Sequence, residues 1–242
     1  MNARIISTFL VMVGFGISFS VNAQFVQEKK ISDSGSNVDY QEMQIQITDA
    51  SNGDEVISDV RVKGLNPRKT VVFESIADTV FEIKNYRLYT VSCIEEGYMY
   101  YTEKFWPAEE VVHLQQVKLH PLRSGLKTDI RDISFLGNKT EIYHKSRSAL
   151  DELTEWLKLN PKVKVAVIGH VNGPDQTRSK KFYRKVSEER AQAVIDYVIS
   201  KGISADRLEA RGAGNSQMIY PDPKTDWQNE ANRRIEIEVT GM

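Results

Sequence analysis

Two polar side chains, His170 and Asn172, follow directly after the apolar run 163–168. This run is short and rich in β-branched residues, which predicts a buried strand, so the two polar side chains are expected at its exposed end. A histidine in such a position could bind a metal ion or transfer a proton. The chain has only four histidines and one cysteine, however, and it contains no H-E-x-x-H motif or paired metal-ligand spacing. The sequence therefore predicts no metal site, and a structural hydrogen bond is the expected role of His170.

Nucleophilic catalysis would need a serine or cysteine with a base within hydrogen-bond reach and a third group that orients the base. The sequence contains no motif of this kind, and its single cysteine, Cys93, lies in an alternating stretch that predicts a buried strand position. The glycine loop 211–214 does not follow the first strand of a βαβ unit, as a dinucleotide-binding loop would. No carboxylate stands out as an acid for glycoside hydrolysis. The chain is therefore predicted not to be an enzyme and to need no cofactor.

The chain has 32 basic and 33 acidic residues, so its net charge is only -1. Proteins that bind nucleic acid usually carry a strong basic footprint, so nucleic acid is not an expected partner. Residues 1–23 combine Arg4, an apolar run and small residues before Ala23, which is the pattern of a secretory signal peptide cleaved after Ala23. The alternative is a membrane anchor, but this run is short for a helix that needs roughly 20 residues to span. The mature protein is expected to be exported and to lack a direct membrane span.

The N-terminal half of the mature chain shows the pattern of an all-β module. Residues 24–40 are polar and predict a flexible leader, whereas residues 41–120 alternate between apolar and polar positions at short intervals. Several short strands separated by turn residues are typical of a small antiparallel β-sandwich. Asn52 and Gly53 are a strong hairpin signal between two of these strands.

Two stretches of this half, 47–64 and 89–105, resemble the carboxypeptidase regulatory-like, immunoglobulin-type modules of exported bacterial proteins. The resemblance implies an Ig-like sandwich that acts as a spacer or a docking surface. The second stretch contains part of an aromatic cluster, which could be a binding patch, although packing in the core and at a sheet edge is the expected role. Its members are Tyr98, Tyr100, Tyr101, Phe105 and Trp106.

Residues 121–242 predict strands that alternate with helices, which indicates an α/β (α+β) layer sandwich with helices packed on a mixed sheet. A short strand is expected at 130–135, and leucines at helical spacing between residues 150 and 157 predict a helix. The apolar strand before His170 is expected in the centre of the sheet with both faces covered. The next helix is expected to begin with Ser187 as its N-cap, and the strand 235–240 closes the domain.

Three segments, 146–172, 186–214 and 229–239, resemble the OmpA-like peptidoglycan-binding domain family. They occur in the family's order and at roughly its spacing. The family pattern is a strand that ends in G-H-T-D, then L-S-x-x-R-A-x-x-V on a helix, a G-x-G loop, and N-R-R-V-E on the last strand. The resemblance implies that this half binds the peptide stem of peptidoglycan non-covalently and ties the outer membrane or its proteins to the cell wall.

The resemblance also implies a set of ligand-binding residues. In the family, the aspartate of G-H-T-D and the arginine of L-S-x-x-R-A hold the zwitterionic end of diaminopimelate. By position, Arg190 matches the arginine and Asn172 the aspartate, while Arg233 and Asn138 match residues that line the same pocket. A guanidinium forms a bidentate pair with a carboxylate, so Arg190 would bind the ligand carboxylate and Asn172 its ammonium. In the first turn after Ser187, Arg190 would also have helix N–H groups beside the ligand.

This chain departs from the family pattern at several positions. Asn172 offers no negative charge, and since a charge-assisted hydrogen bond contributes roughly 1.5–3 kcal/mol against about 1 for a neutral one, binding is expected to weaken about tenfold. Tyr183 stands where the family usually has asparagine, and Leu136 where an aspartate often follows the first strand. The loop after Asn172 is longer than usual and contains Asp175, which could replace the lost charge, and the basic segment 178–185.

Three functions remain open from the sequence. The pocket could bind peptidoglycan, it could bind a different stem or glycan, or it could bind nothing and serve as a scaffold. The first is the prediction: a periplasmic protein of a Gram-negative envelope that links the outer membrane or an envelope complex to the wall. The alternative is a structural subunit of an outer-membrane or secretion complex with a degenerate pocket. The basic segment 178–185 could bind an acidic polymer or an anionic lipid, but a solvated charged loop is expected.

Overall fold

The computed structural model describes residues 40–65, 68–84, 88–105, 112–130, 132–136, 139–174 and 177–242. The predicted signal peptide, 1–23, and nearly all of the predicted leader lie outside these residues. The strands of the N-terminal half are β1 (Tyr40–Asp49), β2 (Ser58–Leu65), β3 (Arg68–Ile76), β4 (Asp78–Lys84), β5 (Tyr89–Ile94), β6 (Tyr101–Phe105) and β7 (Val112–Leu119). The C-terminal half contains β8 (Lys127–Ile130), α1 (Arg147–Leu159), β9 (Lys164–His170), α2 (Lys180–Ser200), β10 (Leu208–Gly214), α3 (Asp226–Asn232) and β11 (Ile235–Gly241).

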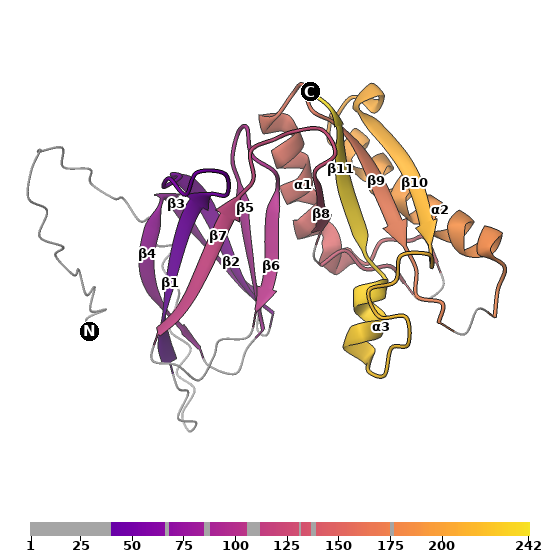
Figure 1. The fold of residues 1–242 in the computed structure, drawn as a ribbon, viewed down its shortest axis with the longest axis horizontal. Coiled ribbons are helices and arrows are strands. Elements are labelled where there is room, and N and C mark those ends of the chain that lie inside the picture. The colour runs from indigo at the N-terminus through magenta and orange to yellow at the C-terminus, as the bar shows by residue number, and fades with distance from the viewer. Residues whose placement is uncertain are drawn as a thin grey trace, which may run out of the picture.

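The strands of the N-terminal half form two sheets, of order β4-β1-β7 and β3-β2-β5-β6 (Figure 1). The predicted alternation holds, because Met43, Ile45 and Ile47 on one face of β1 have no exposed surface, and Val60 of β2 has none either. These side chains belong to one hydrophobic cluster that also contains Cys93 and lies between the sheets. Within the two sheets, neighbouring strands are antiparallel except for β1 and β7, which run parallel. The immunoglobulin-like assignment of this half stays a prediction.

The predicted hairpin at Asn52 and Gly53 is present over a short stretch. A tight turn is present, with Gly53 at a φ of +80° and its N–H donating to the carbonyl of Asp49 (2.9 Å). The strands on either side of it, however, belong to different sheets. Next to the turn the chain pairs as a short antiparallel ladder, in which the N–H of Asp49 donates to Asp54 (2.8 Å) and that of Val56 donates to Ile47 (3.1 Å). Beyond this ladder, the apolar faces of β1 and β2 pack against each other across the core. The turn therefore carries the chain from one sheet to the other.

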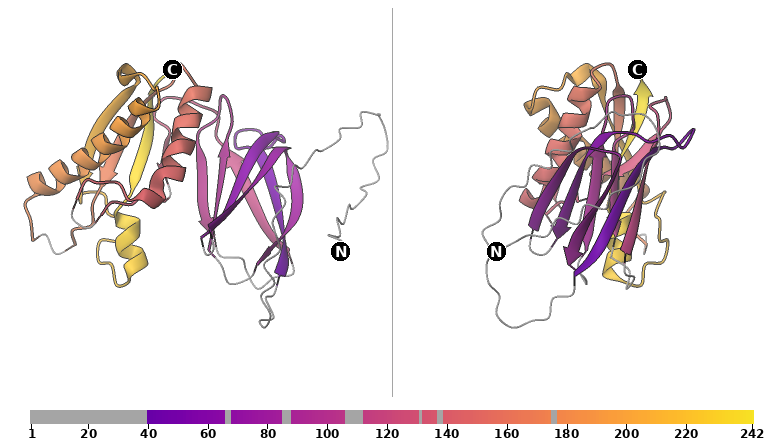
Figure 2. Two further views of the ribbon diagram at one scale, coloured as in Figure 1. Left: turned by 180° about the vertical axis from the view of Figure 1, so that it is seen from behind. Right: turned by 90° about the vertical axis from the view of Figure 1, so that its left-hand side faces the viewer.

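The C-terminal half is a mixed sheet of order β10-β9-β11-β8 with α1 and α2 on one face (Figure 2, left). The strands β9 and β10 are parallel, whereas β11 is antiparallel to both β9 and β8. Leu150, Leu153 and Leu157 of α1 are fully buried against this face, as their spacing predicts. The observed architecture is therefore the predicted one, a mixed α/β layer of helices on a sheet.

The other face of this sheet is covered by charged side chains. The face carries several ion pairs, including Arg211 with Glu238 (3.3 Å) and Lys127 with Glu238 (3.2 Å). Beneath them, Ala166 and Ile168 of β9 are still buried. The predicted burial of β9 on both faces is thus confirmed, but long polar side chains supply the second cover, as their aliphatic stems allow.

The strand predicted at 130–135 is misplaced. The strand β8 ends at Ile130, and beyond it Phe135 makes only an isolated bridge with Ile142. Asp132 has a φ of +66°, a left-handed conformation that ends a strand. Its carboxylate accepts a hydrogen bond from the Thr90 hydroxyl (3.0 Å) and pairs with the Lys104 ammonium (2.6 Å). These contacts with the N-terminal half hold the chain away from the sheet.

The two halves share a hydrophobic core. Ile94, Met99 and Tyr100 of the N-terminal half belong to the same buried cluster as α1 and α2. Between the halves, the indole N–H of Trp156 donates to the carbonyl of Tyr98 (2.8 Å). Core packing is thus confirmed for Tyr100 (2% exposed), whereas Trp106 of the predicted aromatic cluster lies outside the described residues.

The segment between the halves is held by backbone hydrogen bonds on both sides. Met99 donates to the carbonyl of His120 (2.8 Å), and Leu122 donates to Gly97 (2.8 Å). A few residues later, Gly125 donates to Val239 on β11 (2.8 Å). This connection is therefore part of the folded structure of both halves.

Candidate functional site

The predicted site residues come from three elements that meet at one end of the C-terminal sheet. Asn172 follows β9, Arg233 follows α3, and Arg190 lies on α2. The N–H of His170 donates to the carbonyl of Arg234 (3.0 Å), so the exit from β9 and the entry to β11 lie side by side. The fourth predicted residue, Asn138, lies outside the described residues.

The guanidinium of Arg190 is buried, since only 7% of the residue is exposed. Its Nε donates to the carbonyl of Lys139 (3.3 Å), and its Cζ lies 5.0 Å from the ring centre of Phe135. Among the described residues, no carboxylate forms an ion pair with it. Burial, and then the positive charge of Arg233, lower the pKa of Arg190.

This environment is suited to an anion. A buried cation without a carboxylate partner is costly, and a single carbonyl and an aromatic ring offset only part of that cost. The nearby charge of Arg233, which is exposed, adds to the positive potential. A ligand carboxylate beside Arg190 would replace the missing partner and could accept two hydrogen bonds from the guanidinium.

The helix that carries Arg190 begins earlier than the sequence predicts. Ser179, not Ser187, is the N-cap of α2, and its side chain accepts a hydrogen bond from the N–H of Phe182 (3.2 Å). Arg190 therefore lies roughly three turns inside the helix, and the free N–H groups of the helix end do not face the site. The basic segment 178–185 is mostly the first turns of α2, and its charged side chains are exposed, as expected for solvated charges.

Ser187, the predicted cap, connects α2 to the sheet. Its hydroxyl donates to the carbonyl of Arg184 (2.8 Å) and accepts from the N–H of Gly214 (2.9 Å). A Cβ on Gly169 would lie 1.9 Å from the carbonyl oxygen of Ser187, and one on Gly212 would lie 2.3 Å from that of Arg184. The two glycines therefore let α2 pack directly on β9 and β10, which places Arg190.

Asn172 is part of a network of three asparagines. Its Nδ2 donates to Oδ1 of Asn229 (2.8 Å), and its Oδ1 accepts from Nδ2 of Asn232 (2.8 Å). Asn232 also bonds the backbone of Tyr220, donating to its carbonyl (2.7 Å) and accepting from its N–H (2.9 Å). The network ties the end of β9 to α3 and to the loop before it. An aspartate at position 172 could not donate to Asn229, so the amide has a structural use here.

Sequence reasoning missed Asn229 and Asn232, although both lie in the motif segment 229–239.

The other departures from the family pattern have structural roles. Tyr183 is buried, and its hydroxyl accepts from the N–H of Arg178 (3.3 Å) while its ring packs against Gly173. Leu136 bonds through its backbone N–H to Glu141 (2.9 Å), and Asp175 lies outside the described residues.

His170 is buried beneath the charged face of the sheet. Its Nε2 lies 3.2 Å from Oε2 of Glu236, without the geometry of a well-directed hydrogen bond. Arg234 donates to the other carboxylate oxygen of Glu236 (2.6 Å). No group of three or more metal-ligating side chains gathers anywhere in the described part of the chain. The structural hydrogen bond predicted for His170 is not found, because neither of its buried ring nitrogens has a well-directed partner among the described residues.

The ionisation of Glu236 is expected to make the free energy of unfolding depend on pH in the acid range. Burial opposes its ionisation, but His170 and Arg234 outweigh this effect and lower its pKa from 4.5 to about 2. The ionised carboxylate therefore stabilises the fold above pH 4.5, and this contribution is lost as the pH falls from 4.5 towards 2. Denaturant unfolding between pH 2 and 7 should show a flatter acid dependence for Glu236→Gln than for the unmodified chain. Glu238→Gln, on the same strand, is the control, and an equal flattening there would contradict the assignment.

The comparisons with known proteins agree with this geometry. In the C-terminal half, a buried arginine lies on a helix that packs on a mixed sheet. Residues 134–233 match the OmpA family, so the C-terminal half contains an OmpA family domain. The recognition made from the sequence motifs is thereby confirmed for this half.

Two relatives are similar to about half of this chain. Outer membrane protein A of Shigella flexneri is 36% identical over 146 residues, which are 56% of this chain and 38% of that protein. Outer membrane protein A of Escherichia fergusonii is 37% identical over 121 residues, 46% of this chain and 49% of that protein. The chain thus spans less than half the length of these relatives. The names of the family and of these relatives denote no enzyme, in agreement with the sequence prediction.

A solved structure with a similar region is the periplasmic domain of Helicobacter pylori MotB (residues 90–256). It has a TM-score of 0.42 and 20% identity, over 50% of this chain and 76% of that one. Within the described residues of this chain, no helix is both long enough and apolar enough to cross a membrane.

Proposed function

We propose that this chain is an exported envelope protein that binds the peptide stem of peptidoglycan through its C-terminal half. The observation that carries the proposal is the buried guanidinium of Arg190, which has no carboxylate partner among the described residues. The OmpA family match supports it, because the resemblance of the three motif segments implies this ligand.

The proposed recognition uses the two charges at the zwitterionic end of diaminopimelate. Arg190 binds the carboxylate as a bidentate pair, and Arg233 adds a second positive charge. Oδ1 of Asn172 already accepts one hydrogen bond from Asn232, and its second lone pair is available for the ammonium. Asn138 is proposed, by resemblance alone, to line the same pocket. Because the ammonium meets an amide and not a carboxylate, we expect moderate affinity.

The location of the protein follows from the same proposal. The signal-like residues 1–23 would deliver the chain to the periplasm of a Gram-negative cell, and the relatives are named as outer membrane proteins. The N-terminal sheets would then join the wall-bound half to an outer-membrane or secretion-complex protein. A second candidate is a scaffold subunit whose pocket binds nothing, and the engagement of the Asn172 amide in internal hydrogen bonds favours it.

Loss of Arg190 is expected to lower the affinity for stem peptide about 10- to 100-fold, since hydrogen bonds to charged groups contribute roughly 1.5–3 kcal/mol. The measurement is calorimetric titration of the mature chain with a peptide that contains diaminopimelate. Arg190→Ala should weaken binding by this factor, and Arg190→Lys, which keeps the charge without the planar fork, should show a smaller loss.

The matched control is Arg184→Ala, which removes an exposed arginine from the same helix and should leave the affinity unchanged. Thermal unfolding of each variant separates loss of ligand contact from loss of the fold. An affinity of Arg190→Ala equal to that of the unmodified chain would overturn the proposed site. No binding by the unmodified chain would favour the scaffold function.

A further inference from the structure

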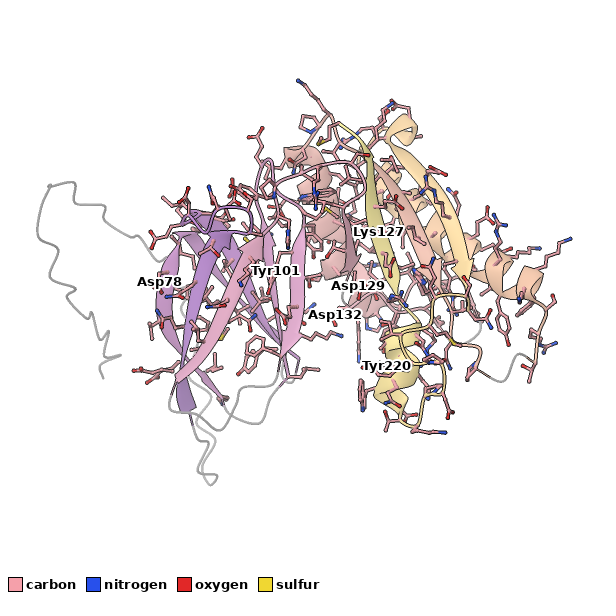
Figure 3. The ribbon with its side chains drawn as sticks, viewed as in Figure 1. Asp78, Tyr101, Lys127, Asp129, Asp132 and Tyr220 are labelled. Carbon is pink, nitrogen blue, oxygen red and sulfur yellow. The ribbon has the colours of Figure 1, made fainter. Side chains whose placement is uncertain are left out.

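Exposed apolar side chains gather on α3 and on the loop before it. Trp227 is 59% exposed and Ile219 is 47% exposed, while Tyr220 is half-buried. The rings of Tyr220 and Trp227 meet edge to face, with centroids 5.0 Å apart and an interplanar angle of 82°. Figure 3 shows Tyr220 beside α3, below the strands of the C-terminal sheet. We call Ile219, Tyr220 and Trp227 the α3 patch.

The α3 patch is structurally connected to the candidate site. The backbone of Tyr220 is bonded to Asn232, and Asn232 is bonded to Asn172. The helix that carries Trp227 ends at Asn232, directly before Arg233. At a rise of about 1.5 Å per residue, Trp227 lies roughly 9 Å along the helix axis from Arg233.

We infer that the α3 patch is a subsite for a sugar ring of the glycan strand whose stem peptide occupies the Arg190 site. This inference rests on the proposed function. A pyranose presents a face of C–H groups that packs on an aromatic ring, with hydroxyls around its rim. An extended peptide advances about 3.3–3.6 Å per residue, so the few stem residues between diaminopimelate and the sugar span a similar distance. Tyr220 holds the indole in one orientation, which lowers the entropy lost on binding.

The charges around the α3 patch favour a sugar over a lipid surface. Asp222, Asp226 and Glu230 are exposed on the same loop and helix, and Lys224 is paired with Asp222. Exposed carboxylates repel the anionic headgroups of a membrane surface but accept hydrogen bonds from sugar hydroxyls. The patch is also small, because it consists of one short loop and a helix of seven residues.

The test compares two ligands on the mature full-length chain. One is a disaccharide–peptide that ends in diaminopimelate, and the other is the same peptide without sugar. Trp227→Ala is expected to weaken binding of the disaccharide–peptide about two- to tenfold and to leave binding of the sugar-free peptide unchanged. Trp227→Phe, which keeps an aromatic face, should retain part of the difference. Phe182→Ala removes an exposed aromatic ring from α2 and should change neither affinity.

The outcomes separate this inference from the function on which it rests. Equal affinity of the unmodified chain for the two ligands would overturn the sugar subsite and leave the stem-peptide site standing. An equal loss for both ligands in Trp227→Ala would show that Trp227 acts by supporting the site, which also overturns the subsite. If the unmodified chain binds neither ligand, the proposed function and the subsite both fail. Binding of anionic vesicles through Trp227, without sugar dependence, would identify a membrane contact instead.

Discussion

Replacement of Gly169 by alanine is expected to destabilise the protein by about 3 kcal/mol or more, the upper end of the cost of overpacking. The new Cβ would lie 1.9 Å from the carbonyl oxygen of Ser187 and 2.8 Å from its carbonyl carbon. These atoms are backbone in the middle of α2, so the helix itself would have to move away from β9. Arg190 lies three residues further along this helix and would move with it. Variants that still fold should therefore lose ligand binding as well.

Urea unfolding, followed by the helical signal in circular dichroism, measures this effect. Gly241→Ala is the matched control, because it adds the same methyl group to a strand of the same sheet. Its Cβ would lie 3.7 Å from the Lys164 side chain, an ordinary contact distance. The unfolding midpoint should fall sharply for Gly169→Ala and remain close to the unmodified value for Gly241→Ala. Similar midpoints for the two variants would contradict the close packing of α2 on β9.

Replacement of Trp156 by alanine is expected to destabilise both halves of the molecule together, by about 3–5 kcal/mol. Trp156 has no exposed surface, belongs to the core shared by the halves, and donates to the carbonyl of Tyr98 (2.8 Å). Its loss leaves a cavity in the buried cluster to which the N-terminal half contributes Met99 and Tyr100. The free energy of unfolding should therefore fall for the N-terminal sheets as well as for α1.

Labelling of Cys93, the single cysteine of the chain, measures the unfolding of the N-terminal half. Cys93 is fully buried in the core between the two sheets of this half, and burial raises the pKa of the thiol to about 12. A thiol reagent should therefore label Cys93 only after this half unfolds. Helical circular dichroism reports on the C-terminal half, which contains α1, α2 and α3. We expect the two signals to share one urea midpoint, which moves as a unit in Trp156→Ala. Leu159→Ala, at a partly exposed position of the same helix, is the control. Two separate midpoints would show that the halves unfold independently.

Most of the fold could be predicted from the sequence because its strands and helices carry strong local patterns. The alternation of β1 places Met43, Ile45 and Ile47 in the core, and the leucines of α1 mark its buried face. The errors occur where a distant contact overrides a local signal. Ser187 followed by two glutamates is a good cap signal, but the chain before it also forms helix, and Ser187 bonds Gly214 of β10. Asp132 ends β8 because Thr90 and Lys104 of the other half hold it.

The candidate site was predictable only through its motifs. These identify Arg190, Asn172 and Arg233, and the structure brings them to one end of the sheet. No local pattern indicates which amides will meet, so the pairing of Asn172 with Asn229 and Asn232 could not be predicted. The same holds for the absence of a carboxylate beside Arg190 among the described residues, because burial and partners are properties of the assembled fold.

The hydrogen-bonded connection between the halves determines how the molecule carries mechanical load. Leu122 is bonded to Gly97 on one side and Gly125 to Val239 on the other, and Trp156 bridges the shared core above them. A pulling force between the Arg190 end of the sheet and the N-terminal sheets is therefore expected to load packed side chains and backbone hydrogen bonds, because the connection 119–126 is hydrogen-bonded to both halves. We therefore expect the described part of the chain to resist extension as one folded body, so that the distance between its two ends is set by the length of the fold.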